Sequence, residues 1–440
     1  MNPKAQVSGL ALILLLLGGF FAATNPAPTP APSPVTTTVA TTVKPTTTVK
    51  PTTTTSTTTI PPAKQIRFGA DTASWNRPVS EFGPWVEQAK YADIFWKYSG
   101  GAADPTLYNS AFSEYSVPMY DAAEATTTVR LYQTVWAQKL YSLGVGLNIG
   151  DSIPWNPKWK PGTGNDNLMS IVDYKAGKVW DIGGVGQVPE NCIDQGLYIF
   201  GIPVIPDGPN FKAGFNRQTM FNANMLCTSG GVSYSNLYTM TDGTTIDGRG
   251  AGINKLIGIP RASEVQAGKI EHALEMTITN TMFGPACVPI EGFSAPGAGI
   301  SCGNFVAPAT KLERTNPNIG CAAQVVNDVE RAKTIPEGMR FAIRATDIDI
   351  ENWLDSRSYT GPIRRTARIF AVALRDYGWF VGETGCFGKH FETSGILGSD
   401  KDLWAANGIT AEPGKTYPKG DLLFGLVTDK NIYVVRSPKA

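Results

Sequence analysis

Three residues that can transfer protons or hold a charge lie close together in this chain: Arg261, Glu264 and His272. They belong to segment 247–274, which contains one of the two histidines in the 440 residues. Hydrolysis of a sugar polymer requires two carboxylates, one as acid and the other as base or nucleophile. Cleavage by β-elimination requires a Tyr or His base and a cation beside the uronate carboxylate. His272 with Arg261 or Arg249 suits the second reaction.

The candidates for a hydrolytic pair are four carboxylates, Asp181, Asp247, Glu264 and Glu271. Each also has a structural explanation. Glu264 can pair with Arg261 one helical turn earlier, and Asp247 can organise the DGRG turn. A catalytic site built on these residues therefore requires Asp181, Glu264 and His272 to converge in an open groove. If they are dispersed, or buried and paired, the hypothesis of catalysis by them is to be dropped.

The periodicity of the chain indicates which elements position these side chains. Segment 260–268, PRASEVQAG, predicts a short helix that begins near a proline and ends at a glycine. The following residues alternate as in a strand, with Ile270, His272, Leu274, Met276 and Ile278 on one face and Glu271, Ala273, Glu275 and Thr277 on the other. His272 is thus expected on the apolar side. A buried structural histidine is favoured there, and a residue that lines a cleft is the alternative.

Aromatic residues offer a second kind of glycan contact. Trp155 and Trp159 stand four positions apart in IPWNPKWKPGTGND (153–166), a segment rich in Pro and Gly. Exposed rings in such a loop can stack on sugar faces. A lid over the core, or a plug within it, is the alternative interpretation.

The six cysteines, at positions 192, 227, 287, 302, 321 and 386, are expected to form disulfides, because an even number in an exported chain is typical of them. Cys287 and Cys302 are the favoured pair, since a disulfide would ease closure of the Gly/Pro-rich loop between them. No pair has CxxC spacing, so we expect no metal site. GxSxG, HExxH, P-loop, EF-hand and dinucleotide-binding motifs are absent from the sequence, and we expect no cofactor.

Short alternating runs broken by turn residues predict a mostly-β fold, a jelly-roll or concanavalin-like β-sandwich. The run IVDYKAGKVWDI (171–182) predicts a hairpin. One amphipathic helix is predicted over 361–378 and a weaker one over 85–98. We expect residues 65–440 to form a single domain.

The N-terminal part of the chain predicts export. The apolar run at 10–23 is too short to span a bilayer, which takes about 20 residues, so 1–24 is read as a signal peptide, with a short membrane anchor as the alternative. Residues 25–64 are almost wholly Thr, Pro, Ala, Ser and Val, and predict a disordered linker. The protein is therefore expected to be secreted or tethered to the cell surface. Contact with a membrane is expected only through an uncleaved N-terminal segment.

The charge balance of the chain excludes one class of partner. With 38 basic and 37 acidic side chains the net charge is +1, and no sustained basic stripe occurs, so nucleic acid is not an expected partner. The sequence leaves the oligomeric state open.

Several separate motifs resemble a widespread family of uncharacterised exported bacterial proteins. They include SWNRPV (74–79), LMSIVDYKAGKVWDIGG (168–184), GRGAGINKLIGIPRASEVQAGKIEHAL (248–274) and ARIFAVALRDYGWFV (367–381). The resemblance implies an exported β-rich domain and supplies no catalytic residues. The chain departs from the family pattern in long cysteine-containing insertions, at 192–227 and 287–321, and in the Thr/Pro linker.

Together these features predict an exported cell-surface protein that acts on or binds an extracellular polysaccharide. If it is an enzyme, it is expected to cleave by hydrolysis or by elimination. The alternative is a non-catalytic glycan-binding, adhesion or structural cell-wall module.

Overall fold

The structure, a computed structural model, describes most of the chain from residue 66 to residue 438. The described ranges are 66–99, 108–133, 147, 151–164, 166–185, 198–199, 202–203, 225–228, 230–243, 248–282, 289–290, 293–294, 303–313, 332–385, 388–412 and 419–438. The predicted signal peptide and linker lie outside these residues, as do Asp247, Cys287 and Cys302. Ile60–Ala440 forms one compact unit. No helix within the described ranges combines the length and the apolar character needed to cross a membrane.

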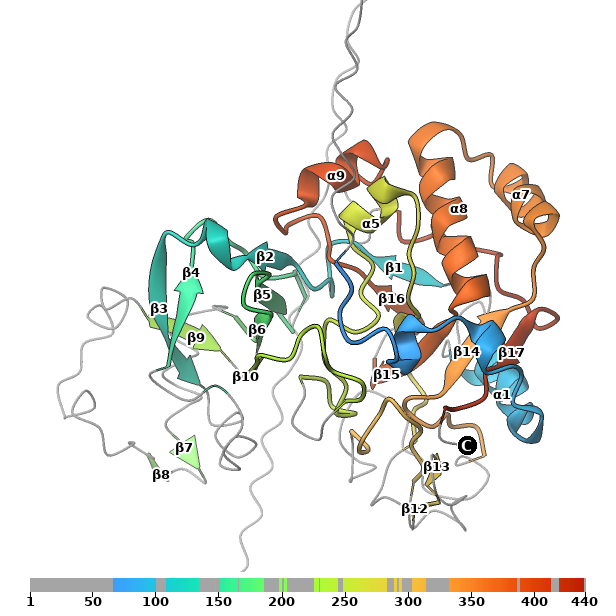
Figure 1. Cartoon of the computed structure of the whole chain (residues 1–440), viewed down its shortest axis with the longest axis horizontal. Coiled ribbons are helices and arrows are strands. Elements are labelled where there is room, and N and C mark those ends of the chain that lie inside the picture. Colours follow the sequence, from blue (N-terminus) through green and yellow to red (C-terminus); the bar gives the residue numbers. More distant parts are fainter. Residues whose placement is uncertain are drawn as a thin grey trace, which may run out of the picture. The chain divides into compact units, whose positions relative to one another are not determined.

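The segment around His272 leads into one of the two middle strands of a six-stranded mixed sheet. Figure 1 labels the other five strands of this sheet. The order across this sheet is β1 (Asn109–Ala111), β16 (His390–Glu392), β11 (Leu274–Ile278), β15 (Trp379–Thr384), β14 (Arg340–Ile343) and β17 (Ile432–Val434). β11 runs parallel to β15 and antiparallel to β16. The carboxyl ends of β11 and β15 therefore meet at one edge of the sheet.

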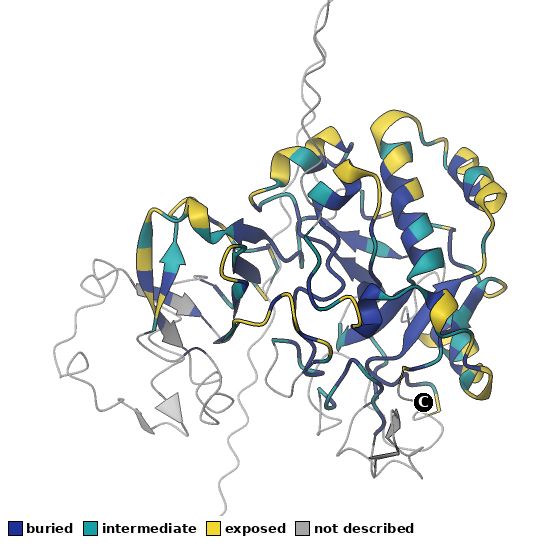
Figure 2. Cartoon of the chain, viewed as in Figure 1, coloured by how far each residue is buried: buried dark blue, intermediate teal, exposed yellow. Residues whose placement is uncertain are grey.

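Helices pack on one face of this sheet. They are α8 (Gly361–Asp376), its neighbour α7 (Asp347–Ser356) and α1 (Lys90–Tyr98). The buried stripe of α8 includes Phe370 and Leu374, which join the same core as Leu274 and Met276. Figure 2 shows this buried stripe of α8 and its exposed outer face. Both predicted helices are confirmed, although the weaker one begins only at Lys90, after the 3₁₀ turn η3 (Val86–Gln88).

The opposite face of the six-stranded sheet shares a second core with a four-stranded sheet. The order in this sheet is β10 (Gly230–Tyr234), β6 (Lys178–Gly183), β5 (Met169–Asp173) and β2 (Met119–Asp121). Phe380 and Ala273 pack in one cluster with Val172 and Val179. β5 and β6 are antiparallel neighbours, which confirms the predicted hairpin.

The remaining described elements are small. The strands are β3 (Thr127–Gln133), β4 (Ser152–Trp155) and β9 (Met225–Thr228) in one sheet, and the pairs β7 (Tyr198–Ile199) with β8 (Ile202–Pro203) and β12 (Pro289–Ile290) with β13 (Phe293–Ser294). The helices are α5 (Ala262–Ala267), α9 (Lys401–Ala406), η1 (Ser74–Asn76), η2 (Val79–Glu81) and η4 (Ala122–Glu124).

Mixed sheets with few helices are compatible with the mostly-β fold predicted from the sequence. The jelly-roll arrangement is not confirmed. Jelly rolls are antiparallel, whereas β11 with β15, β1 with β16 and β2 with β5 are parallel pairs.

We expect limited proteolysis to remove the N-terminal Thr/Pro segment and to leave a stable fragment that begins near residues 60–65. The reason is that a segment without aromatic residues has little apolar surface to bury and so cannot protect its backbone. Mass spectrometry of the fragment measures the boundary. Recovery of two independently folding pieces from the remainder would contradict the single domain predicted for 65–440.

Candidate functional site

Strand β11 separates an apolar face from a polar one, as its alternating sequence predicts. Leu274, Met276 and Ile278 pack in the helix-side core, so Glu275 and Thr277 project from the other face. Glu275 is fully buried. A buried carboxylate requires a partner, and its partner defines the candidate site.

A β-bulge brings a second carboxylate to this face. Val381 pairs with Met276, but the next residue of β11, Thr277, pairs with Glu383, so Gly382 is the extra residue. Regular alternation would direct Glu383 to the helix side, together with Val381. The bulge instead aligns Glu383 with Thr277 on the polar face, and this re-aiming of a side chain is a common use of bulges.

Glycine is required at the bulge for a steric reason. A Cβ on Gly382 would collide with the Glu275 carboxyl group. The absence of a side chain at residue 382 therefore leaves the space in which the Glu275 carboxylate is buried.

Arg249 holds three carboxylates together. Its Nη1 lies 2.9 Å from Glu383 Oε2, and its Nη2 lies 2.8 Å from Glu392 Oε2 and 3.4 Å from Glu275 Oε2. Thr277 Oγ1 donates to the second oxygen of Glu392 at 3.4 Å. The side chains of Arg249 and Glu275 are fully buried, that of Glu392 is 6% exposed and that of Glu383 is 25% exposed. Glu383 is therefore the most accessible of these three carboxylates.

The glycine-rich part of segment 248–260 positions Arg249. The backbone N–H of Arg249 donates to Ile253 O at 3.0 Å, and its Nη2 donates to Lys255 O at 3.3 Å. Ile253, with Leu256 and other residues of the segment, is buried in the core between the two sheets. The segment thus packs against the polar face of the sheet and directs the guanidinium at the carboxylates.

The environment gives these carboxyl groups different proton affinities. Burial raises the pKa of Glu383 to about 7, against the opposing charges of Lys255 and Arg249. Burial also raises the pKa of Glu275 well above its usual range. At Glu392 burial is outweighed by the charge and hydrogen bond of Arg249, and the pKa is lowered. Carboxyl groups whose pKa values are displaced in opposite directions are the pattern of an acid–base pair.

Another carboxyl pair lies beside Glu383. Glu313 accepts from the backbone N–H of Thr384 at 2.7 Å, and its own N–H donates to Glu337 Oε2 at 2.9 Å. Burial, followed by the charge of Glu313, raises the pKa of Glu337 well above its usual range. The negative charge of Glu313 also contributes to the raised pKa of Glu383.

Asp181 is buried on β6 and contacts the Arg249 segment rather than joining a groove with Glu264. Ser170 Oγ donates to Asp181 Oδ1, and the Tyr234 hydroxyl lies 3.1 Å from Oδ2. The same hydroxyl lies 2.5 Å from Oδ1 of Asn254, within segment 248–260. Burial raises the pKa of Asp181. We assign Asp181 a positioning role toward this segment.

Arg261, Glu264 and His272 are brought together, but as a buried and mutually paired group. Glu264 Oε1 lies 2.7 Å from Arg261 Nη2, and its Oε2 lies 3.3 Å from His272 Nε2. His272 Nδ1 lies 2.9 Å from Ala273 O. Glu264 also accepts from the backbone N–H of Arg261, which caps helix α5. The condition for catalysis by Glu264 and His272 with Asp181, convergence in an open groove, is therefore not met. We assign Arg261, Glu264 and His272 to the anchoring of α5. This helix lies within the predicted segment 260–268 and ends at Gly268 (φ 97°), as predicted.

The two loop tryptophans pack inward. Trp159 is buried, stacks on Tyr120 at 5.0 Å between ring centroids and meets Trp155 edge-on at 5.9 Å. Trp155 is half-buried against the same cluster. The structure thus gives Trp159 the role of a core plug and leaves part of Trp155 accessible.

Comparison with protein-family models, curated proteins and solved structures finds no match for this chain. The resemblance to a family of exported bacterial proteins therefore stays a prediction. Among the described residues no group of three or more His, Cys, Asp or Glu side chains is arranged to hold a metal ion.

Glu383 and Glu392 were not among the residues that the sequence singled out. One usable signal was the glycine inside the strand-like run GWFVGET, because an isolated glycine within a strand often marks a bulge. Glu392 had no comparable signal. It meets Arg249 across 143 positions of sequence.

We predict that Gly382→Ala lowers the free energy of unfolding by about 2 kcal/mol, because the new methyl group displaces the buried Glu275. Chemical denaturation measures this value. Gly382 does not have a positive φ, so the cost comes from the collision rather than from backbone strain. Combining Gly382→Ala with Glu275→Ala should relieve the collision, with a coupling of about 1 kcal/mol. Strict additivity of the two substitutions would contradict the steric explanation.

We predict that Glu264→Gln destabilises the protein by about 3 kcal/mol at pH 7, because it breaks a buried ion pair. Burial would raise the pKa of Glu264, but Arg261 and His272 lower it to about 2 in the folded state. In the unfolded chain the pKa is about 4.3. The stabilisation is therefore present above about pH 4.3 and is lost as the pH falls through about 2.

Denaturation of wild type and variant across this pH range measures the difference between them. The exposed Glu87, which pairs with Arg436, supplies the control Glu87→Gln. This control should change stability by less than about 1 kcal/mol. A gap between wild type and Glu264→Gln that stays constant from pH 7 to pH 2 would disprove the linkage.

Proposed function

We propose that this protein hydrolyses a glycosidic bond of an extracellular polysaccharide, with Glu383 as the proton donor and Glu392 as the base or nucleophile. The observation that carries the proposal is the arrangement around Arg249. One guanidinium binds two carboxyl groups, of which Glu383 has a pKa raised to about 7 and Glu392 has a lowered pKa. An acid and a base of this kind are what glycoside hydrolysis requires.

Each group has a defined part in the reaction. Protonated Glu383, accessible over a quarter of its side chain, transfers its proton to the glycosidic oxygen as the bond to the anomeric carbon breaks. In a single displacement, ionised Glu392 takes a proton from water, whose oxygen bonds to the anomeric carbon. In a double displacement Glu392 bonds to the carbon first, and water then replaces it. Both routes add one water across the bond. In the double displacement Glu383 takes a proton from the attacking water and is thereby restored, and Glu392 leaves as the carboxylate. In the single displacement Glu392 then releases its proton to solvent and Glu383 takes one up.

The surrounding residues position the pair. Thr277 and Arg249 orient Glu392, while Glu275 shares the guanidinium from within the core. Arg261, Glu264 and His272 anchor α5, and Asp181 holds segment 248–260 through Tyr234 and Asn254. Both ring nitrogens of His272 are engaged, one by Glu264 and the other by Ala273 O, so neither is free to take a proton from a substrate. Hydrolysis is therefore favoured over a lyase reaction.

The predicted signal peptide and Thr/Pro linker support an extracellular polymer as the substrate, with the protein secreted or tethered to the cell surface. The family resemblance supports the same location. The concanavalin-like jelly roll belongs to this proposal as a prediction only, and the parallel strand pairs of the central sheet do not favour it.

A non-catalytic glycan-binding, adhesion or structural cell-wall module is the second candidate. One observation favours it: Arg249 and Glu275 are completely buried, as in an ion network that serves only the fold. The part of Trp155 that stays accessible would then supply a stacking surface.

A screen of neutral and acidic polysaccharides for new reducing ends tests the proposal. We expect wild type to cleave one class, and Glu383→Gln and Glu392→Gln to lower kcat by at least about 100-fold. Glu87→Gln is the matched control on the exposed surface. Both site variants must keep the wild-type denaturation midpoint within a few degrees. Cleavage at the wild-type rate by folded Glu383→Gln would exclude Glu383 as the acid.

The pH profile of kcat/KM provides a further prediction. Activity should fall as the pH rises through about 7, because Glu383 then loses the proton that it must donate. The acidic limb should lie below the usual carboxyl range, because Arg249 lowers the pKa of Glu392. A wild-type profile that stays flat from pH 6 to pH 9 would contradict the assignment of Glu383.

A further inference from the structure

A cavity of about 300 Å³ opens at the N-terminal end of α5, lined by none of the residues that bind Arg249. Its walls come from β2 and η4, from the turn after β5, from α5 and from the start of α9. This volume is at the lower end for small-molecule sites, roughly 300–1,000 Å³. The cavity therefore suits one small unit rather than a long chain segment.

The charge around the cavity is negative. Four carboxylates line it, Asp121, Glu124, Asp400 and Asp402, against one cation among the lining residues, Arg261. Asp402 also pairs with Lys401 Nζ at 3.1 Å. The guanidinium of Arg261 is already paired with Glu264 at 2.7 Å. The cavity thus has an excess of negative charge and favours a cationic occupant.

Two buried polar atoms at the cavity have no hydrogen-bond partner, namely Arg261 Nε and Asp400 Oδ1. The Arg261 side chain is only 7% exposed. The other oxygen of Asp400 accepts from Ala262 N at 3.0 Å, which fixes the carboxyl group against α5. Leaving a buried donor and a buried acceptor unsatisfied is costly. Both atoms are covered by the surrounding protein, so a ligand meets the half-buried side chains of Asp400 and Tyr174 rather than these atoms.

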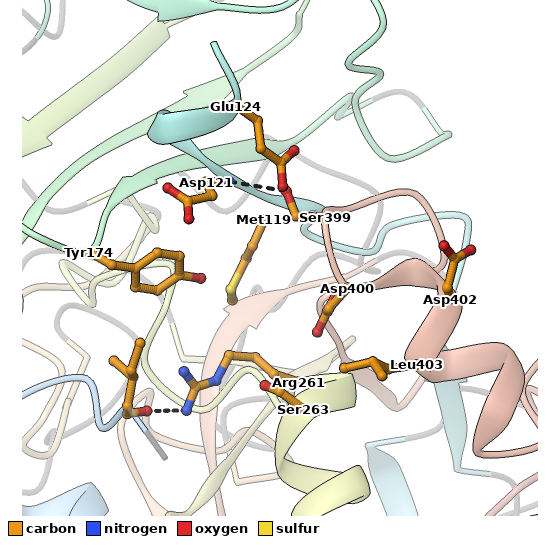
Figure 3. Close-up of a pocket in the computed structure, with 11 residues that line it drawn as sticks. Met119, Asp121, Glu124, Tyr174, Arg261, Ser263, Ser399, Asp400, Asp402 and Leu403 are labelled. Atoms are coloured by element: carbon orange, nitrogen blue, oxygen red, sulfur yellow. Dashed lines mark hydrogen bonds between the residues drawn. The ribbon is translucent and has the colours of Figure 1, made fainter. Parts of the chain in front are cut away.

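Tyr174 adds an apolar surface with a polar tip. Figure 3 shows its ring extending toward Met119 and Arg261, with the hydroxyl pointing into the space that the lining residues enclose. Burial raises the pKa of Tyr174 to about 12, so the hydroxyl remains a donor at neutral pH. Burial raises the pKa of Asp400 only to about 6, so this carboxyl group is ionised at pH 7.5. An aromatic face beside a carboxylate suits a sugar ring that bears an ammonium group.

We propose that this cavity binds one amino-sugar unit with a free, protonated amine, so that the protein selects a de-N-acetylated glycan. The ammonium group donates to the Asp400 carboxylate, and the sugar ring lies against Tyr174. An N-acetyl group would remove the positive charge and add bulk in a cavity of about 300 Å³. The identification of the ligand as a glycan rests on the proposed function, whereas the preference for an amine rests on the cavity.

Isothermal titration of the full chain at about pH 6.5, where glucosamine amines are substantially protonated and Asp400 remains largely ionised, tests the inference with three tetrasaccharides: the glucosamine tetramer, its fully N-acetylated form and cellotetraose. We expect the glucosamine tetramer to bind at least about tenfold more tightly than the other two, corresponding to one lost charge-assisted contact. Equal affinity for the three compounds, or no binding of the amine form, would overturn the proposal.

Substitutions of lining residues test whether the glucosamine tetramer binds in this cavity. Asp400→Asn should weaken binding of the glucosamine tetramer at least about tenfold, and Tyr174→Phe should weaken it through loss of the hydroxyl. Asp355→Asn is the matched control, since it removes the same charge from exposed α7. If Asp400→Asn fails to fold, Asp402→Lys supplies the test, because Asp402 is 92% exposed and a lysine there repels the amine. Unchanged affinity in the folded Asp400→Asn or Asp402→Lys variant would refute the site.

The proposed hydrolase activity and the proposed amino-sugar site can be refuted independently of each other. Binding is measured in the Glu383→Gln background, so it does not depend on cleavage. Amine-selective binding by a protein that cleaves no polysaccharide would support the cavity and refute the hydrolase. Cleavage of a polysaccharide without any preference for free amines would support the hydrolase and refute the cavity.

Discussion

The buried charge of Arg249 is the constraint on which the rest of the site depends. A guanidinium fully removed from water needs carboxylates around it, and it finds them on three neighbouring strands, β11, β15 and β16. The three carboxyl groups depend on it unequally, because the pKa of Glu392 is lowered beside it whereas burial keeps the pKa values of Glu275 and Glu383 raised. The cation therefore fixes segment 248–260 against the sheet and also separates the proton affinities of Glu383 and Glu392.

The two layers of the domain meet at this same segment. Its apolar residues, such as Ile253 and Leu256, complete the core between the six-stranded and the four-stranded sheets. Its polar residues reach in two directions, Arg249 toward the strand carboxylates and Asn254 toward Tyr234 beside Asp181. A displacement of the segment would thus disturb the packing of the core and the ionisation of the site together.

The elements that depend on short-range sequence patterns could be predicted from the sequence. The alternation after Gly268, the short helix before it and the amphipathic helix α8 follow from side-chain periodicity, and the structure confirms them. The burial of His272 on the apolar side also agrees with the favoured interpretation. The grouping around Arg249 was not predictable, because Glu383 and Glu392 meet it across 134 and 143 positions of sequence. The parallel pairing of β11 with β15 is equally non-local, which explains why a sequence of alternating runs suggested an antiparallel sandwich.

The bulge at Gly382 also makes the site depend on the number of residues in β15. Removing this one residue would restore regular alternation, so that Val381 would be followed directly by the glutamate on the polar face. The space beside Glu275 would then lie at a different step of the strand, and the parallel register beyond Met276 would no longer need to shift. Gain of one residue between Val381 and Glu383 would instead align the glutamate with Ile278 on the helix side, so an in-frame insertion here is a sharper lesion than most substitutions. Relatives that retain the function should differ in side chains here far more readily than in strand length.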